Sequence, residues 1–124
     1  MPTVLIIDDE DLDRKVLHSI LLSAGYEVIG TARSGEEGIE LSRTLKPDLV
    51  TIDLMMPKMN GYEVCQCVKE VDSQTYIMLL TAKGPAVDKE QCFAVGANEY
   101  VTKPCDPEYV HERAAEVWWI RLFA

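Results

Sequence analysis

Short apolar runs alternate along this chain with longer stretches in which apolar residues recur every three or four positions. Short runs of apolar and β-branched residues predict strands, whereas recurrence at three and four positions predicts amphipathic helices. Predicted strands cover residues 3–7, 27–32, 48 or 49 to 53, 76–81 and 99–102. Predicted helices cover residues 12–24, 35–45, 61–71, 87–95 and the stretch from 107 onward.

Local signals mark the ends of several predicted helices. Gly25 follows the first helical stretch as a C-cap. Ser34 and Glu37 have the spacing of a capping box at the start of the second. Asp106 and Pro107 supply an N-cap and a proline at the first helical position of the last.

Strict alternation of strands and helices predicts a parallel sheet with helices on both faces. The expected fold class is α/β, a doubly wound five-stranded parallel sheet with five helices. A length of 124 residues is that of one ordinary domain. Because no linker, repeat or low-complexity stretch interrupts the pattern, we expect a single domain over residues 1–124 with no output domain.

Polar residues stand where the predicted strands end. The first strand ends in Asp8-Asp9, the third in Asp53 and the fourth in Thr81, and Lys103 follows the fifth. In sheets of this kind ligands bind at the carboxyl ends of the strands. These side chains are therefore expected to converge on one edge, although they are nearly a hundred residues apart.

The residue types at this edge suit one kind of chemistry. Carboxylates at short range repel one another, so either one is protonated or a cation neutralises them. Mg²⁺ prefers such oxygen ligands. With Lys103 and a hydroxyl added, the set suits phosphoryl transfer to Asp53 as nucleophile. Each residue alone is also typical of a solvated turn, a strand or a surface lysine, and only the combination indicates a site.

Five motifs in this chain resemble those of a known family. They are Asp8-Asp9, Asp53-Leu-Met-Met-Pro-Lys-Met-Asn-Gly61, Thr81-Ala82, Gly96-Ala97 and Tyr100-Val-Thr-Lys103-Pro104. In order and position they look like the receiver domain of bacterial two-component response regulators, which has a flavodoxin-like fold. The resemblance extends from about residue 3 to about residue 117.

The resemblance implies a phosphoacceptor and a metal. Asp53 would take a phosphoryl group from a histidine of a sensor histidine kinase or a histidine phosphotransfer protein. Asp9, Asp53 and the backbone carbonyl of Met55 would hold Mg²⁺ as cofactor, and Asp8 would bind it through water or help to position it. Such a domain catalyses its own phosphorylation and dephosphorylation and is not an enzyme acting on a metabolite.

The resemblance also implies a switch. Lys103 would pair with the phosphoryl oxygens, aimed by a cis bond to Pro104. Thr81 would move to hydrogen-bond the phosphate, and Tyr100 would follow it inward. A downstream domain or partner would read the change.

Three other interpretations of the same residues stay open. A phosphatase with an aspartyl nucleophile would need a second acid two positions after Asp53, where the chain has Met55. A flavodoxin-like cofactor protein would need a Gly-rich or Ser/Thr-rich first loop, which is missing. A receiver fold used only as a scaffold is disfavoured by the complete set of Asp9, Asp53, Thr81 and Lys103.

Composition narrows the setting and the partners. A net charge of −9 argues against nucleic-acid binding by this domain, and it reflects either solubility or acidity concentrated for a cation. The apolar runs are too short to span a membrane and no signal peptide is visible, which predicts a soluble, cytoplasmic protein without membrane contact. The four cysteines are expected to be free thiols.

The last predicted helix has more apolar surface than one packed stripe needs. Val110, Ala114, Val117 and Arg121 form one stripe, whereas its end is apolar nearly all round. Either Trp118 packs in the core with the rest exposed, or the end contacts a second copy of the chain or an output domain. The residues expected at that contact are Trp118, Trp119 and Ile120.

Overall fold

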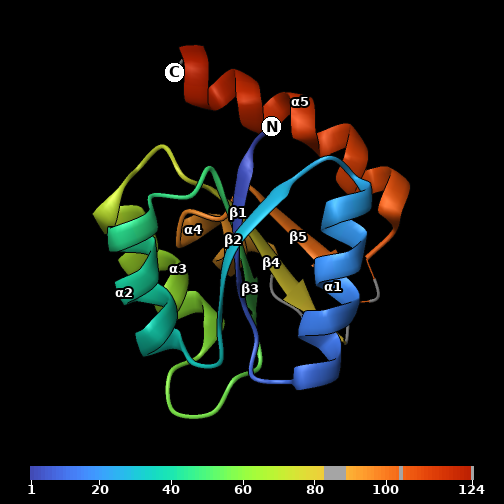
Figure 1. Ribbon diagram of the computed structural model, residues 1–124. Coiled ribbons are helices and arrows are strands. Elements are labelled where there is room, and N and C mark those ends of the chain that lie inside the picture. Colours follow the sequence, from blue (N-terminus) through green and yellow to red (C-terminus); the bar gives the residue numbers. More distant parts are fainter. Residues whose placement is uncertain (83–88, 104, 124) are drawn as a thin grey trace.

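Five parallel strands form the central sheet of the computed structural model, which describes residues 1–82, 89–103 and 105–123 and their side chains, except those of Arg121 and Phe123. The strand order is β2-β1-β3-β4-β5 (Figure 1). The elements are β1 (Thr3–Ile7), α1 (Asp11–Ser23), β2 (Glu27–Ala32), α2 (Gly35–Leu45), β3 (Leu49–Asp53), α3 (Gly61–Val71), β4 (Tyr76–Thr81), α4 (Lys89–Ala94), β5 (Glu99–Thr102) and α5 (Pro107–Phe123). All five predicted strands and the predicted fold class are confirmed.

The middle of the sheet is apolar and the edges are less so. Every residue of β3 and β4 is buried, whereas most residues of the edge strands β2 and β5 are partly exposed. A parallel sheet covered on both faces requires this distribution. The register pairs Ile7 with Ile52 and Asp53 with Leu80, so the residues that follow β1 lie beside the end of β3.

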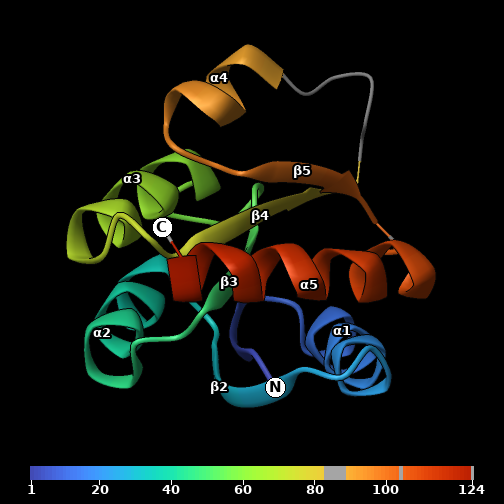
Figure 2. The same cartoon turned by 90° about the horizontal axis from the view of Figure 1, so that it is seen from above.

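Helices cover both faces of the sheet and enclose two cores. Helices α1 and α5 lie on one face, and α2, α3 and α4 lie on the other (Figure 2). Alternate residues of β1 serve the two cores: Val4 and Ile6 pack on the α1–α5 side, whereas Leu5 and Ile7 pack on the other side. The carboxyl ends of the strands remain between these layers as the place where polar side chains meet.

Most of the predicted helix ends are confirmed. Gly25 has a φ of 92°, the left-handed conformation that ends α1 at low steric cost. The Ser34 hydroxyl accepts a hydrogen bond from the Glu37 backbone N–H at the start of α2, and an Asp106 oxygen accepts one from a backbone N–H in the first turn of α5. Of the helix predicted over 87–95, positions 87–88 lie outside the described residues.

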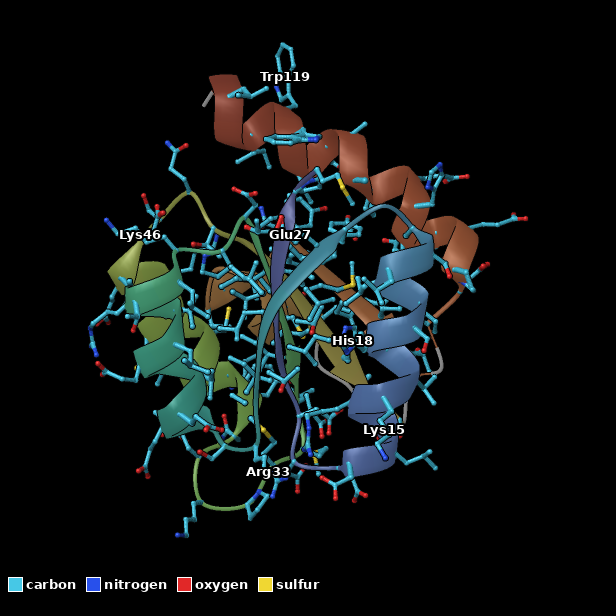
Figure 3. All side chains as sticks on the ribbon, in the orientation of Figure 1. Lys15, His18, Glu27, Arg33, Lys46 and Trp119 are labelled. Carbon is cyan, nitrogen blue, oxygen red and sulfur yellow. The ribbon has the colours of Figure 1, made fainter. Side chains whose placement is uncertain are left out.

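The end of α5 packs only in part against the body of the protein. Val110 and Val117 are buried, as the predicted stripe requires. Trp119 is 62% exposed and points away from the body of the protein (Figure 3). Trp118 is only partly buried, and Ile120 packs partly against the α1–α5 core, so this candidate contact residue is not freely available. None of the described helices is both long enough and apolar enough to cross a bilayer.

Candidate functional site

Three carboxylates meet at the carboxyl end of the sheet. Asp8 and Asp9 follow β1, Asp53 ends β3, and one oxygen from each lies within 4.8 Å of the others. Asp8 and Asp53 are buried, with 1% and 5% of their surface exposed. The sequence predicted this convergence, because the carboxyl ends of parallel strands share one edge.

Asp53 is held by the turn that leaves β3. The Met55 backbone N–H donates to Asp53 Oδ1 at 3.2 Å, and the Leu54 N–H continues the sheet by donating to the Leu80 carbonyl at 2.8 Å. A Cβ at Gly61 would lie 2.8 Å from the Asp53 carbonyl oxygen and 2.7 Å from the Leu54 Cα. Only glycine therefore allows α3 to start this close to the carboxylate.

Asp8 is held equally firmly after β1. Its backbone N–H donates to the Ala32 carbonyl at 3.0 Å, and its Oδ1 accepts from the Glu10 N–H at 2.9 Å. Arg14 donates to its carbonyl oxygen at 2.7 Å. The carboxylate thus has its second oxygen, Oδ2, directed at the fifth strand.

Lys103 brings a positive charge to this edge. Its Nζ lies 2.8 Å from Asp8 Oδ2, 2.9 Å from Asp13 Oδ2 and 3.6 Å from Asp53 Oδ2. The Lys103 backbone N–H donates to the Thr81 carbonyl at 2.7 Å, so the end of β4 positions the lysine. Asp13 was not among the predicted site residues, because it lies within the first helix and not at the end of a strand.

Burial and crowding shape the protonation of the site. Burial raises the pKa of Asp53 to about 6, and the charge of Asp8 adds to the rise while Lys103 opposes it. Burial alone would lower the pKa of Lys103, but the hydrogen bonds to Asp13 and Asp8 outweigh burial and raise it above its usual range. The lysine therefore stays charged, and three carboxylates share its one positive charge.

One carboxylate oxygen in the cluster, on Asp9, differs from the others in its hydrogen bonding. Asp9 Oδ1 is buried and has no hydrogen-bond partner among the described residues. A buried carboxylate oxygen is costly unless something compensates it. The three side chains that could coordinate a metal ion here all offer carboxylate oxygens, which are the ligands that Mg²⁺ prefers. Asp8, Asp9 and Asp53 therefore fit a magnesium ion.

The two candidate switch residues lie on one face of neighbouring strands. Thr81 ends β4 and is buried. The register pairs Leu79 with Tyr100, and Thr81 is two residues beyond Leu79, so all three share a face. The Tyr100 ring is half-buried against the core on the α4 side, with Lys89 Nζ 5.4 Å from its centroid.

Two further predictions about the site concern the Met55 carbonyl and the bond to Pro104. The Met55 side chain is 75% exposed, and its backbone N–H contacts Asp53, while metal binding through its carbonyl stays a prediction. The cis bond expected at Pro104 lies outside the described residues.

The family model for the response regulator receiver domain matches residues 4–115. The chain belongs to this family. The match includes every predicted site residue from Asp8 to Lys103, and it ends before Trp118 and Trp119 in α5. The receiver domain predicted from the motifs is thus confirmed.

Known proteins similar to this receiver domain differ in length. The alkaline phosphatase synthesis transcriptional regulatory protein PhoP of Bacillus subtilis is 39% identical over 114 residues, which are 92% of this chain and 47% of PhoP. The chemotaxis protein CheY of Thermotoga maritima is 37% identical over 114 residues, 92% of this chain and 95% of CheY. The chain therefore spans about half the length of the transcriptional regulator and nearly all of CheY.

One similar solved structure is a complex that contains BeF3 and Mg²⁺. The CheX–CheY–BeF3–Mg²⁺ complex from Borrelia burgdorferi has a TM-score of 0.84 and 32% identity, covering 94% of this chain and 88% of that chain. Its fold and the acidic cluster in our structure are consistent with a magnesium site in this family.

Proposed function

We propose that Asp53 accepts a phosphoryl group from a histidine of a sensor histidine kinase or a histidine phosphotransfer protein, in a Mg²⁺-dependent reaction. The observation that supports this best is the position of Asp53, buried at a strand end with two carboxylates and one ammonium around it. Asp53 is then the nucleophile, Lys103 the partner of the charge it receives, and Thr81 the sensor.

The proposed transfer is a single displacement at phosphorus. An Asp53 carboxylate oxygen attacks the phosphorus atom, and the electron pair of the breaking P–N bond returns to the histidine ring, which leaves as neutral imidazole when its other nitrogen carries a proton. With a pKa of about 6, Asp53 is mostly ionised at neutral pH and can attack. Mg²⁺, held by Asp9, Asp53 and the Met55 carbonyl with Asp8 nearby, would offset charge on the transferred group.

The phosphorylated state needs new contacts from this chain. An acyl phosphate adds about −1.5 to −2 charge to an edge that is already acidic. Lys103 can offset part of it, and the hydroxyl of the buried Thr81 can donate to a phosphoryl oxygen. Movement of Thr81 would free space on the strand face that it shares with Tyr100, so the ring could turn inward.

A hollow next to Lys103 offers access for the phosphodonor. Its volume is about 270 Å³, and it lies between α1 and the segment after β5. Val16, which lines it, is 45% exposed, and Leu12, four residues earlier on α1, is 70% exposed. An apolar helix face that carries the donor histidine would fit there. The residues that line the hollow are Asp8, Asp13, Val16, Leu17, Ile20, Leu80, Ala82, Lys103 and Cys105.

A downstream domain or partner would read the change at Asp53. The chain would act as a cytoplasmic signalling switch, catalysing only its own phosphorylation and dephosphorylation. Exposed apolar groups at the end of α5, Trp119 above all, support a contact there with an output domain or with a second copy of the chain.

The decisive experiment is intact mass spectrometry after incubation with Mg²⁺ and acetyl phosphate. We expect one added phosphoryl group that hydroxylamine removes, and none for Asp53→Asn or without Mg²⁺. Glu10→Gln is the matched control, because Glu10 is exposed and the backbone N–H by which it holds Asp8 is unchanged. Absence of a mass increase in the unmodified chain would favour the scaffold interpretation.

A further inference from the structure

The ammonium of Lys103 has two close partners before any phosphoryl group arrives. Its distances to Asp8 and Asp13, 2.8 Å and 2.9 Å, are those of charge-assisted hydrogen bonds. The 3.6 Å to Asp53 is too long for a hydrogen bond. The resting lysine is therefore hydrogen-bonded to the residue after β1 and to α1, and not to the proposed phosphoacceptor.

The two close partners differ in how easily they can release the lysine. The Asp8 side chain is 1% exposed, so loss of Lys103 would leave a buried carboxylate unpaired. The Asp13 side chain is 43% exposed, so water can replace the ammonium at little cost. Asp13 is consequently the partner that can give way when a new anion appears beside Asp53.

We propose that Asp13 is a positioning residue that holds the Lys103 ammonium on the α1 side of the site and competes for it with an incoming phosphoryl group. This rests on the proposed phosphorylation of Asp53. Asp13 thereby sets how strongly the site favours the phosphorylated state, without touching the phosphoryl group.

The competition has a predictable sign. In the resting site Lys103 divides its hydrogen bonds between Asp8 and Asp13. A phosphoryl group must attract the ammonium away from Asp13 and must also tolerate a nearby negative charge. Both effects oppose the phosphorylated state, so removal of the Asp13 carboxylate should strengthen binding of a phosphate mimic. A merely structural role for Asp13 predicts weaker binding instead.

The test compares beryllium trifluoride binding to the unmodified chain, Asp13→Asn and Glu10→Gln, at saturating Mg²⁺, followed by fluorine NMR. Since a partly exposed ion pair contributes little, we expect Asp13→Asn to bind the mimic roughly two- to five-fold more tightly. Glu10→Gln removes one charge of the same sign from a neighbouring exposed position and should give a smaller shift. Asp13→Ala should change binding in the same direction as Asp13→Asn, and Asp13→Glu should restore the original affinity.

Calorimetric titration with Mg²⁺ alone provides a second readout. Without Asp13, the Lys103 ammonium interacts more strongly with Asp8 and Asp53. The affinity of the variant for Mg²⁺ should therefore fall or stay unchanged, while its affinity for the mimic rises. Equal or weaker mimic binding by Asp13→Asn, or an equal shift in Glu10→Gln, would overturn the inference. If the unmodified chain neither binds the mimic nor gains a phosphoryl group, the proposed function itself fails.

Discussion

Two half-buried lysines stand at opposite ends of the same sheet, and their partners differ in charge. Lys69 lies at the amino ends of β4 and β5, where its Nζ donates to the Thr75 carbonyl at 2.7 Å and to Asn98 Oδ1 at 3.1 Å. Lys103 lies at the carboxyl ends of the same two strands. Its partners are the carboxylates of Asp8, Asp13 and Asp53.

This difference separates a structural contact from a responsive one. Burial lowers the pKa of Lys69, and its electrostatic interactions with Cys65 and Asp72 oppose that effect only in part. At Lys103 the carboxylates outweigh burial and raise the pKa. Lys69 joins the end of α3 to the starts of two strands through neutral oxygen acceptors. Lys103 brings one positive charge to several carboxylates, and the remaining negative charge is what a metal ion can offset.

The largest change in the free energy of unfolding should come from removing a negative charge at the carboxyl end of the sheet. Without Mg²⁺ at pH 7, we expect Asp53→Asn to raise the free energy of unfolding by about 2 to 3 kcal/mol, because the pKa of about 6 lies well above the ordinary 3.8 and each unit corresponds to about 1.4 kcal/mol. Urea unfolding in EDTA measures this. Added Mg²⁺ should then stabilise the unmodified chain more than the variant. A variant no more stable than the original would contradict the account of a crowded, buried carboxylate.

A substitution at Lys69, at the amino ends of β4 and β5, should change the free energy of unfolding in the opposite direction. Lys69→Met leaves the Thr75 carbonyl and the Asn98 amide oxygen without their donor, which should lower the free energy of unfolding by about 1 to 3 kcal/mol. Its stabilisation by Mg²⁺ should equal that of the unmodified chain. Lys15→Met, at an exposed position of α1, is the control and should change stability by less than about 0.5 kcal/mol. A weakened Mg²⁺ response in Lys69→Met would show that the two ends are coupled.

A smaller effect should appear on acidification. The folded pKa of Asp53 lies above its ordinary value, so between about 6 and 3.8 the folded state binds more protons than the unfolded state. Stability from this group therefore rises as pH falls through that window. From pH 7 to pH 5 in EDTA, the advantage of Asp53→Asn over the unmodified chain should shrink by about 1 kcal/mol. An advantage that stays constant with pH would mean that Asp53 does not titrate there.

The smallest effect should come from a region that belongs to neither lysine network. Trp119 is 62% exposed near the end of α5, so Trp119→Ser should alter the free energy of unfolding by less than about 0.5 kcal/mol. Sedimentation with and without beryllium trifluoride tests its role as a contact. If the unmodified chain self-associates and the variant does not, the end of α5 is the dimer surface. If the unmodified chain is a monomer in both states, the homodimer hypothesis is wrong and contact with an output domain is the hypothesis that is left.

The elements were predictable because their signals are local. The apolar runs at Leu49–Asp53 and Tyr76–Thr81 are confirmed as strands, and Ser34 caps α2 as its spacing with Glu37 predicted. Each signal depends on neighbours within a few residues. The end of α5 was harder, because whether Ile120 packs on the core depends on how the whole helix sits against the sheet.

The site was predictable in its members and less so in its pairings. Asp8, Asp9 and Asp53 were expected together from their strand ends, and their oxygens do converge. Asp13 was missed, since an acid on α1 reaches Lys103 only when the rotation of that helix turns it toward the segment after β5. Lys69 was missed for the same reason, because its partners, Thr75 and Asn98, belong to two other segments.

The order of strands and helices and the polar residues at the strand ends thus follow from the sequence, because periodicity, capping and strand polarity are properties of short segments. The tertiary structure alone decided how the aspartates differ in burial and in their contacts with Lys103. Asp8 is buried against the lysine, and Asp9 has a buried oxygen that accepts no hydrogen bond from the described part of the chain. Asp13 holds the lysine from the solvent side. These differences depend on distances of a few ångströms between separate elements, which register and helix packing set.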